Sequence, residues 1–222
     1  MVSTPIGNLR DMTFRAVEIL QSVDIIAAED TRTSKKLLNH YQISTDCISY
    51  HDKNEQFRAN ELIESLHNWS SVAVITDAGT PCISDPGYRI VNAAHRENIT
   101  VITIPGPSSV TAALSISGLP TDHYYFEGFL PRKKGRKTHL EFLANLPATI
   151  VIFESPHRIV KTLENVKLYM GSRWVSVGRE LTKKFEECFF GVIDDAISYF
   201  SSKKNKGEFV IMVAKSGYSI DD

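Results

Sequence analysis

Residues 72–87 read VAVITDAGTPCISDPG, and the order of residue types in this stretch decides the fold class. An apolar run over 72–76 predicts a buried strand, and a loop rich in Gly, Pro and small polar residues follows it. Two similar loops, TPIGN at 4–8 and PGPSS at 105–109, also follow apolar runs. Ligands of open α/β sheets bind at the carboxyl ends of strands. The three loops therefore predict a small-molecule site built largely from backbone groups.

Outward from this stretch, apolar runs alternate with amphipathic segments through the first half of the chain. The predicted strands cover 24–28, 47–50, 72–76 and 99–104, and the predicted helices cover 12–23, 31–41, 54–69, 88–97 and from Ser108 or Ser109 to about 117. Asp11 is the predicted cap of the first helix, and Phe14 and Phe57 are predicted to face inward. This alternation predicts a mainly parallel α/β sheet.

The order of predicted strands and helices changes after Gly118-Leu119-Pro120. Strands are predicted over 124–129, 148–153, 174–181, 185–191 and 208–214, with helices over 138–146, 157–170 and 194–201. Only a short polar turn, 182–184, separates two of these strands, which is typical of an antiparallel pair. We therefore expect two α/β domains, residues 1–118 with a mainly parallel sheet and residues 119–222 with a mixed sheet.

Composition and motifs exclude several classes of protein. The 222 residues include 25 basic and 26 acidic side chains, and no apolar run is long enough to span a membrane. Three scattered cysteines and the absence of a signal-peptide pattern favour a reducing, cytoplasmic location. The sequence has no Walker A, G-x-G-x-x-G, H-E-x-x-H, C-x-x-C or G-x-S-x-G motif, so we expect no bound metal and no hydrolase nucleophile.

Positive charge is concentrated in one short segment. Residues 1–120 contain nine basic and 13 acidic side chains, whereas residues 121–222 contain 16 and 13. Five of the six residues from 132 to 137 are cations: Arg132, Lys133, Lys134, Arg136 and Lys137. A solvated loop and a phosphate-binding patch both remain open as interpretations of this run.

Several stretches in chain order carry a resemblance to a known family. They are TPIGNLRD at 4–11, VDIIAAEDTR at 23–32, DAGTPCISDPGY at 77–88, IPGPSS at 104–109, FEGFLPRKKGRK at 126–137 and FESPHR at 153–158. Together they resemble the ribosomal small-subunit methyltransferase I family. The resemblance implies the tetrapyrrole methylase fold and S-adenosylmethionine-dependent 2'-O-methylation of a cytidine in the decoding region of 16S rRNA. It also implies a homodimer.

The resemblance further implies roles for individual residues. The methyl donor would be bound by Pro5, Asp77, Gly79, Thr80, Cys82, Ser108, Ser109, Phe153 and Glu154. The catalytic group would include Glu29, Asp30, Arg32, Glu154 and Glu180, with Asp30 or Glu29 paired to Arg32. A carboxylate within reach of the ribose hydroxyl would accept its proton, and Glu29, Asp30, Asp85, Glu154 and Glu180 are open candidates.

RNA phosphates would be bound by the cationic run at 132–137. One alternative is a tetrapyrrole or other small-molecule methyltransferase of the same fold, which has no need of five clustered cations. A non-catalytic RNA-binding or ribosome-assembly factor is a second alternative. Binding of the methyl donor would argue against it.

Overall fold

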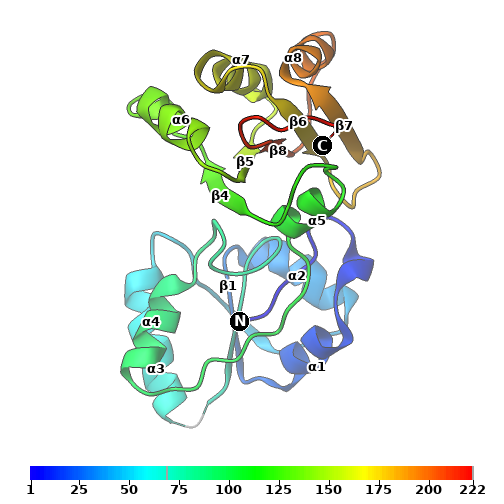
Figure 1. Ribbon diagram of the computed structural model, residues 1–222. Coiled ribbons are helices and arrows are strands. Elements are labelled where there is room, and N and C mark those ends of the chain that lie inside the picture. Colours follow the sequence, from blue (N-terminus) through cyan, green and yellow to red (C-terminus); the bar gives the residue numbers. More distant parts are fainter. Residues whose placement is uncertain (69, 222) are drawn as a thin grey trace. The chain divides into compact units, whose positions relative to one another are not determined.

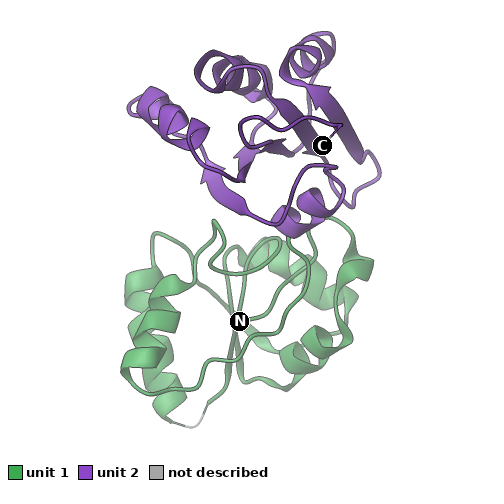
Figure 2. Ribbon diagram, viewed as in Figure 1, with its two compact units in different colours: residues 1–108 green, residues 109–222 purple. Residues whose placement is uncertain are grey.

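The computed structural model describes residues 1–68 and 70–221, and the chain divides into two compact units (Figures 1 and 2). The units are Met1–Ser108 and Ser109–Asp222. The boundary lies ten residues earlier than the expected one because helix α5 (Ser109–Ser115) belongs to the second unit. Its apolar side chains Val110, Ala113 and Leu114 are buried, and it packs against strand β8 (Phe209–Val213).

The first unit contains a parallel sheet, as the sequence predicted. Strands β1 (Ile25–Ala28), β2 (Asp46–Ser49) and β3 (Val72–Ile75) have the order β2-β1-β3, with both pairs parallel. Parallel pairing of β1 with its two neighbours brings the carboxyl ends of all three strands to one edge. The loops that follow these strands therefore begin side by side.

In the described part of this unit, four α-helices and a short 3-10 helix surround the sheet. Their bounds are η1 (Leu9–Asp11), α1 (Phe14–Ser22), α2 (Thr31–His40), α3 (Glu55–His67) and α4 (Tyr88–Arg96). The cap of α1 is Thr13 and not Asp11. Phe14 and Phe57 are 91% and 65% exposed, so the inward prediction was wrong for both. Smaller side chains, such as Ala16 in α1 and Ala59 in α3, occupy the buried stripes instead. The predicted end of α3 at Trp69 lies outside the described residues.

The predicted strand at 99–104 is reduced to a single bridge between Val2 and Ile104. Val2 N donates to Val74 O at 2.9 Å, and Ile104 N donates to Met1 O at 2.8 Å. Next to these contacts an apolar groove of about 490 Å³ separates Val72–Val74 from Thr100–Ile102. Within the described residues, 99–103 have no strand neighbour across this groove, and a strand requires one for its hydrogen bonds.

The second unit contains the predicted mixed sheet. Strands β4 (Tyr124–Phe129), β5 (Thr149–Glu154), β6 (Trp174–Arg179) and β7 (Glu187–Val192) combine with β8 in the order β4-β5-β8-β6-β7. The pair β4–β5 is parallel and the others are antiparallel. In the described range, 1–68 and 70–221, no helix is long and apolar enough to cross a bilayer.

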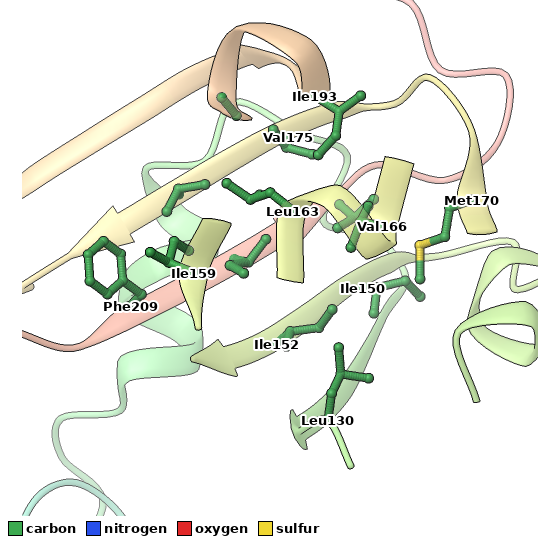
Figure 3. Close-up of a cluster of buried hydrophobic side chains, with 14 of the residues drawn as sticks. Leu130, Ile150, Ile152, Ile159, Leu163, Val166, Met170, Val175, Ile193 and Phe209 are labelled. Carbon is green, nitrogen blue, oxygen red and sulfur yellow. The ribbon is translucent and has the colours of Figure 1, made fainter. Parts of the chain in front are cut away.

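Helices cover one face of this second sheet. They are α6 (Arg136–Ala144), α7 (Ile159–Met170) and α8 (Ile193–Ser201). Ile150 and Ile152 of β5 point toward Leu163 and Val166 of α7 in the core shown in Figure 3, and all four are at most 2% exposed. Because side chains alternate along a strand, Phe153 points to the opposite face.

Candidate functional site

The three Gly- and Pro-rich loops meet in the first unit. Thr4 and Gly79 exchange two backbone hydrogen bonds of 2.9 and 3.0 Å, which join the first loop to the second. Thr80 then connects all three, because its hydroxyl lies 3.0 Å from Ser3 Oγ and donates to Pro107 O at 3.2 Å. Hydrogen bonds thus join the first and second loops across 75 residues of sequence and the second and third across 27.

Glycine at position 79 is favoured by its backbone conformation. Its φ of +87° lies in the left-handed region that side chains disfavour. A Cβ atom there would lie 3.4 Å from Ile6 Cγ2 and 3.9 Å from Pro107 O. A branched side chain at this position would therefore disturb the junction of the loops.

The other predicted donor-binding residues of the first unit lie in or beside these loops. Pro5 is buried directly after Thr4, and Ser108 follows Pro107 in the third loop. Cys82 is half-buried, has a φ of +75°, and donates its backbone N–H to Pro86 O at 3.2 Å. Ser109 begins the seven-residue helix α5 of the second unit.

Carboxylates gather where β1 and β3 end. Asp77 N donates to Glu29 Oε2 at 3.4 Å, and Asp30 N donates to Asp77 Oδ1 at 3.1 Å. Burial raises the pKa of Glu29 and of Asp77. The pKa of Asp85 is raised to about 7, mainly by burial and secondly by the negative charge of Glu29. Among residues 1–68 and 70–221, no group of three or more potential ligands is arranged to hold a metal ion.

Asp30 has a different environment from its neighbour Glu29. It caps helix α2 by accepting from Arg32 N at 2.8 Å, and it also accepts from Arg32 Nε at 3.1 Å and Nη2 at 2.8 Å. Hydrogen bonds from the Arg32 side chain and backbone lower the pKa of Asp30 to about 2. Asp30 is therefore the partner of Arg32, and its carboxylate is a weak proton acceptor at neutral pH.

Glu154 lies inside the second unit, with a side chain that is 0% exposed. It accepts from Thr162 Oγ1 at 2.6 Å and from Ser155 N at 2.8 Å, and Arg158 Nη2 lies 3.4 Å away. These contacts occupy both carboxylate oxygens in the core. This burial argues against the predicted catalytic and donor-binding roles of Glu154 and for a structural one.

Glu180 likewise connects two segments of the second unit. Its Oε1 accepts from Lys183 Nζ and from Glu208 N, both at 3.0 Å, so it joins the turn after β6 to the residue before β8. Phe153, in contrast, is half-buried, and its ring centroid lies 5.0 Å from that of Phe126 and 5.6 Å from that of Phe129. Glu180 thus fits a structural role, whereas Phe153 lies on a sheet face with other aromatic rings.

The cationic run separates into two kinds of residue. Arg132, Lys133, Lys134 and Lys137 are exposed, as a phosphate-binding patch requires. Arg136 is only 9% exposed and donates to Asn165 Oδ1, Pro131 O and Thr162 Oγ1 at 2.9, 3.1 and 2.7 Å. Its burial and these three partners favour a structural role for Arg136 over the predicted contact with RNA.

Sequence reasoning missed Ser3, whose hydroxyl pairs with Thr80. It also missed the prominent exposure of Phe129, which is 59% exposed beside the cationic run. The signal for Phe129 is present in the sequence FLPRKK at 129–134, where an aromatic residue immediately precedes the cations. No sequence pattern distinguishes Ser3 from other small polar residues.

Comparisons with known proteins agree with the family resemblance found in the sequence. A model of the Tetrapyrrole (Corrin/Porphyrin) Methylases matches residues 1–197. The chain is 46% identical over its whole length to Ribosomal RNA small subunit methyltransferase I of Halalkalibacterium halodurans, of which it covers 77%. It is 50% identical to the Synechocystis protein of that name, with 96% of this chain and 77% of the relative covered. For the Thermotoga maritima protein of that name the identity is 44%, with 96% of both chains covered.

Solved structures support the fold at much lower identity. A diphthine synthase has a TM-score of 0.76 at 14% identity, with 99% of this chain and 92% of that chain covered. A uroporphyrin-III-C-methyltransferase from Thermus thermophilus has a TM-score of 0.65 at 16% identity, with 96% and 92% covered. With the family model and the relatives above, the chain belongs to the ribosomal RNA small subunit methyltransferase I family, a group of S-adenosylmethionine-dependent enzymes with the tetrapyrrole methylase fold.

Proposed function

We propose that this protein transfers the methyl group of S-adenosylmethionine to the 2'-hydroxyl of a cytidine in the decoding region of 16S rRNA. The observation that carries the choice of RNA is the group of exposed cations Arg132, Lys133, Lys134 and Lys137 on a chain of net charge −1. Clustered cations repel one another, and an RNA backbone offsets this repulsion. The names of the relatives support the coarser part of this proposal, a ribosomal RNA of the small subunit as substrate. We also propose that the enzyme acts as a cytoplasmic homodimer.

The joined loops are the proposed donor site. When bound, the donor supplies a methyl group activated by a positively charged sulfur. Ala78, Gly79 and Thr80 themselves carry small side chains or none, which suits close approach of a ligand to their backbone. The neighbouring carboxylates of Glu29 and Asp77 carry the charge that a cationic donor requires. Pro5, Cys82, Ser108, Ser109 and Phe153 remain proposed contacts.

Glu29 and Asp85 are the proposed proton acceptors. Of the five candidate carboxylates, Asp30 is held by Arg32, Glu154 by Thr162 and Glu180 by Lys183. Of these five, only Glu29 and Asp85 combine a position in the first unit's carboxylate cluster with a raised pKa, and the pKa of Asp85 is raised to about 7. A base with a pKa near the working pH is the most effective acceptor of a hydroxyl proton.

The test is methyl transfer to small ribosomal subunits that lack the modification. We expect labelled methyl from S-adenosylmethionine to enter 16S rRNA at one cytidine, on the ribose and not the base. Nuclease digestion followed by mass spectrometry locates the label. Label on a base, on ribosomal protein, or only on an added tetrapyrrole would overturn the proposal. Lack of donor binding in calorimetry would favour a non-catalytic RNA-binding protein.

A further inference from the structure

The edge of the second sheet carries aromatic rings on the face opposite its helices. Strands β4 and β5 pair in parallel with Phe129 opposite Phe153, and an irregularity lies between Phe126 and Gly128. The rings of Phe126 and Phe129 both contact Phe153, so these three share one face. Glu127 belongs to the other face, because its Oε1 lies 2.7 Å from His139 Nε2 of helix α6. The irregularity thus places two phenylalanines of β4 on one side.

Phe129 is the outermost member of this group. It is 59% exposed, whereas Phe126 and Phe153 are half-buried. Its ring meets Phe153 at an interplanar angle of 65° and a centroid separation of 5.6 Å. The contact supports the Phe129 ring from one side and leaves most of its surface exposed. The exposed face of this ring, backed by two further rings and followed directly by cations, forms a surface suited to binding a flat apolar group.

The backbone that follows Phe129 is fixed from inside the unit. Leu130 is 2% exposed and its carbonyl accepts from Arg158 Nη2 at 3.0 Å. The next carbonyl, that of Pro131, accepts from the buried Arg136 at 3.1 Å. These contacts hold the ring of Phe129 and the exposed cations 132–134 as neighbours on one anchored segment. The charge of the segment is complementary to a polyanion and unfavourable for a second copy of itself.

We propose that Phe129 is a stacking residue for an unpaired base of the RNA substrate, with Arg132, Lys133 and Lys134 binding the adjoining phosphates. The inference deepens the proposed function and rests on it. Specific RNA recognition relies on unstacked bases that are received by aromatic side chains. An exposed ring beside cations provides both parts of a single-strand site, the stacking surface and the backbone contacts.

The test measures binding of a single-stranded RNA oligonucleotide that carries 2-aminopurine, with its duplex form as a comparison. We expect Phe129→Ala to weaken single-strand binding roughly 5- to 150-fold, the range observed for loss of one stacked base. Phe129→Trp restores binding and fluorescence quenching, whereas Phe129→Leu does not, because leucine is apolar without an aromatic face. The salt dependence stays that of the parent, since the phosphate contacts are retained.

Phe57→Ala is the matched control, because Phe57 is 65% exposed on helix α3 of the other unit. This variant binds RNA like the parent. Full binding by Phe129→Leu, or a change in the sedimentation of Phe129→Ala without loss of RNA binding, would overturn the stacking role. Parent protein that methylates 16S rRNA while Phe129→Ala binds normally contradicts only this inference. Parent protein that shows the stacking effect but methylates no 16S rRNA contradicts only the proposed function.

Discussion

Arg136 donates a 2.7 Å hydrogen bond to the hydroxyl of Thr162, a residue with no exposed surface. The same hydroxyl donates to Glu154 Oε2 at 2.6 Å, so it connects a buried cation to a buried anion. Asn165 and Arg158 complete the network from helix α7 and the residue before it. This network holds together the start of α6, the end of β5 and the start of α7.

Removal of the buried cation is expected to destabilise the protein. We predict that Arg136→Gln lowers the free energy of unfolding by about 3–5 kcal/mol, because Thr162, Asn165 and the carbonyl of Pro131 lose a buried charged donor and Glu154 loses a nearby positive charge. Urea denaturation measures the change. Lys137→Gln, at an exposed position next in sequence, changes stability by less than about 0.5 kcal/mol. Equal stability of the two variants would show that the network contributes little.

The exposed cations are expected to control RNA affinity through phosphate contacts. Replacing Arg132, Lys133, Lys134 and Lys137 with Gln reduces the slope of log affinity against log salt by at most about 3 units on single-stranded RNA. Affinity for the methyl donor, measured by calorimetry, is unchanged. An unchanged salt slope together with normal methylation would identify the segment as a solvated loop.

The junction of the three loops is expected to require Gly79. We predict that Gly79→Val abolishes donor binding in calorimetry, because the φ of +87° strains any side chain and the valine methyl groups extend beyond a Cβ that already contacts Ile6 and Pro107. Gly171→Val is the matched control, since Gly171 has a φ of +79° with no atom within 4 Å of its Cβ position. It adds similar backbone strain and keeps donor binding. Normal donor binding by folded Gly79→Val would remove this loop from the donor site.

Asp85 is expected to shape the pH dependence of turnover. The raised pKa of about 7 predicts that kcat/KM increases as pH rises through 7, because only the ionised carboxylate accepts a proton. Asp85→Asn lowers turnover by about 10²- to 10⁴-fold and removes this inflection. Asp24→Asn, at the opposite end of β1, leaves the profile intact. If the inflection persists in Asp85→Asn, Glu29 is the next group to replace.

The same carboxyl group is expected to reduce stability at high pH. Because the folded-state pKa is raised above the unfolded value of about 3.8, the folded state binds more protons, and stability falls as pH rises from 4 to 7. Asp85→Asn removes this loss. The gain of the variant over the parent in free energy of unfolding is therefore about 1–3 kcal/mol larger at pH 8 than at pH 4. Urea melts at both pH values test the sign, and an equal effect at both would contradict the raised pKa.

The sequence by itself determined the fold class and the position of the Gly- and Pro-rich loops. Apolar runs such as 72–76 are buried whichever partners they find, so the strands at 25–28 and 72–75 appeared close to their predicted positions. Gly- and Pro-rich loops mark strand ends through their local backbone preferences, and the pairing of Thr4 with Gly79 agrees with that prediction. These features depend on residues that are near in sequence.

Tertiary structure decided the features that depend on distant partners. Residues 99–103 have strand-forming side chains, but among the described residues no strand of the sheet pairs with them. Arg136 looks like the cations beside it, yet it is buried because Asn165 and Thr162 lie within reach of its donors. Five candidate carboxylates are chemically alike in sequence, and only their folded partners give Asp30 a pKa of about 2 and Asp85 one of about 7. Burial and partners are long-range properties, so the fold and not the local sequence sets them.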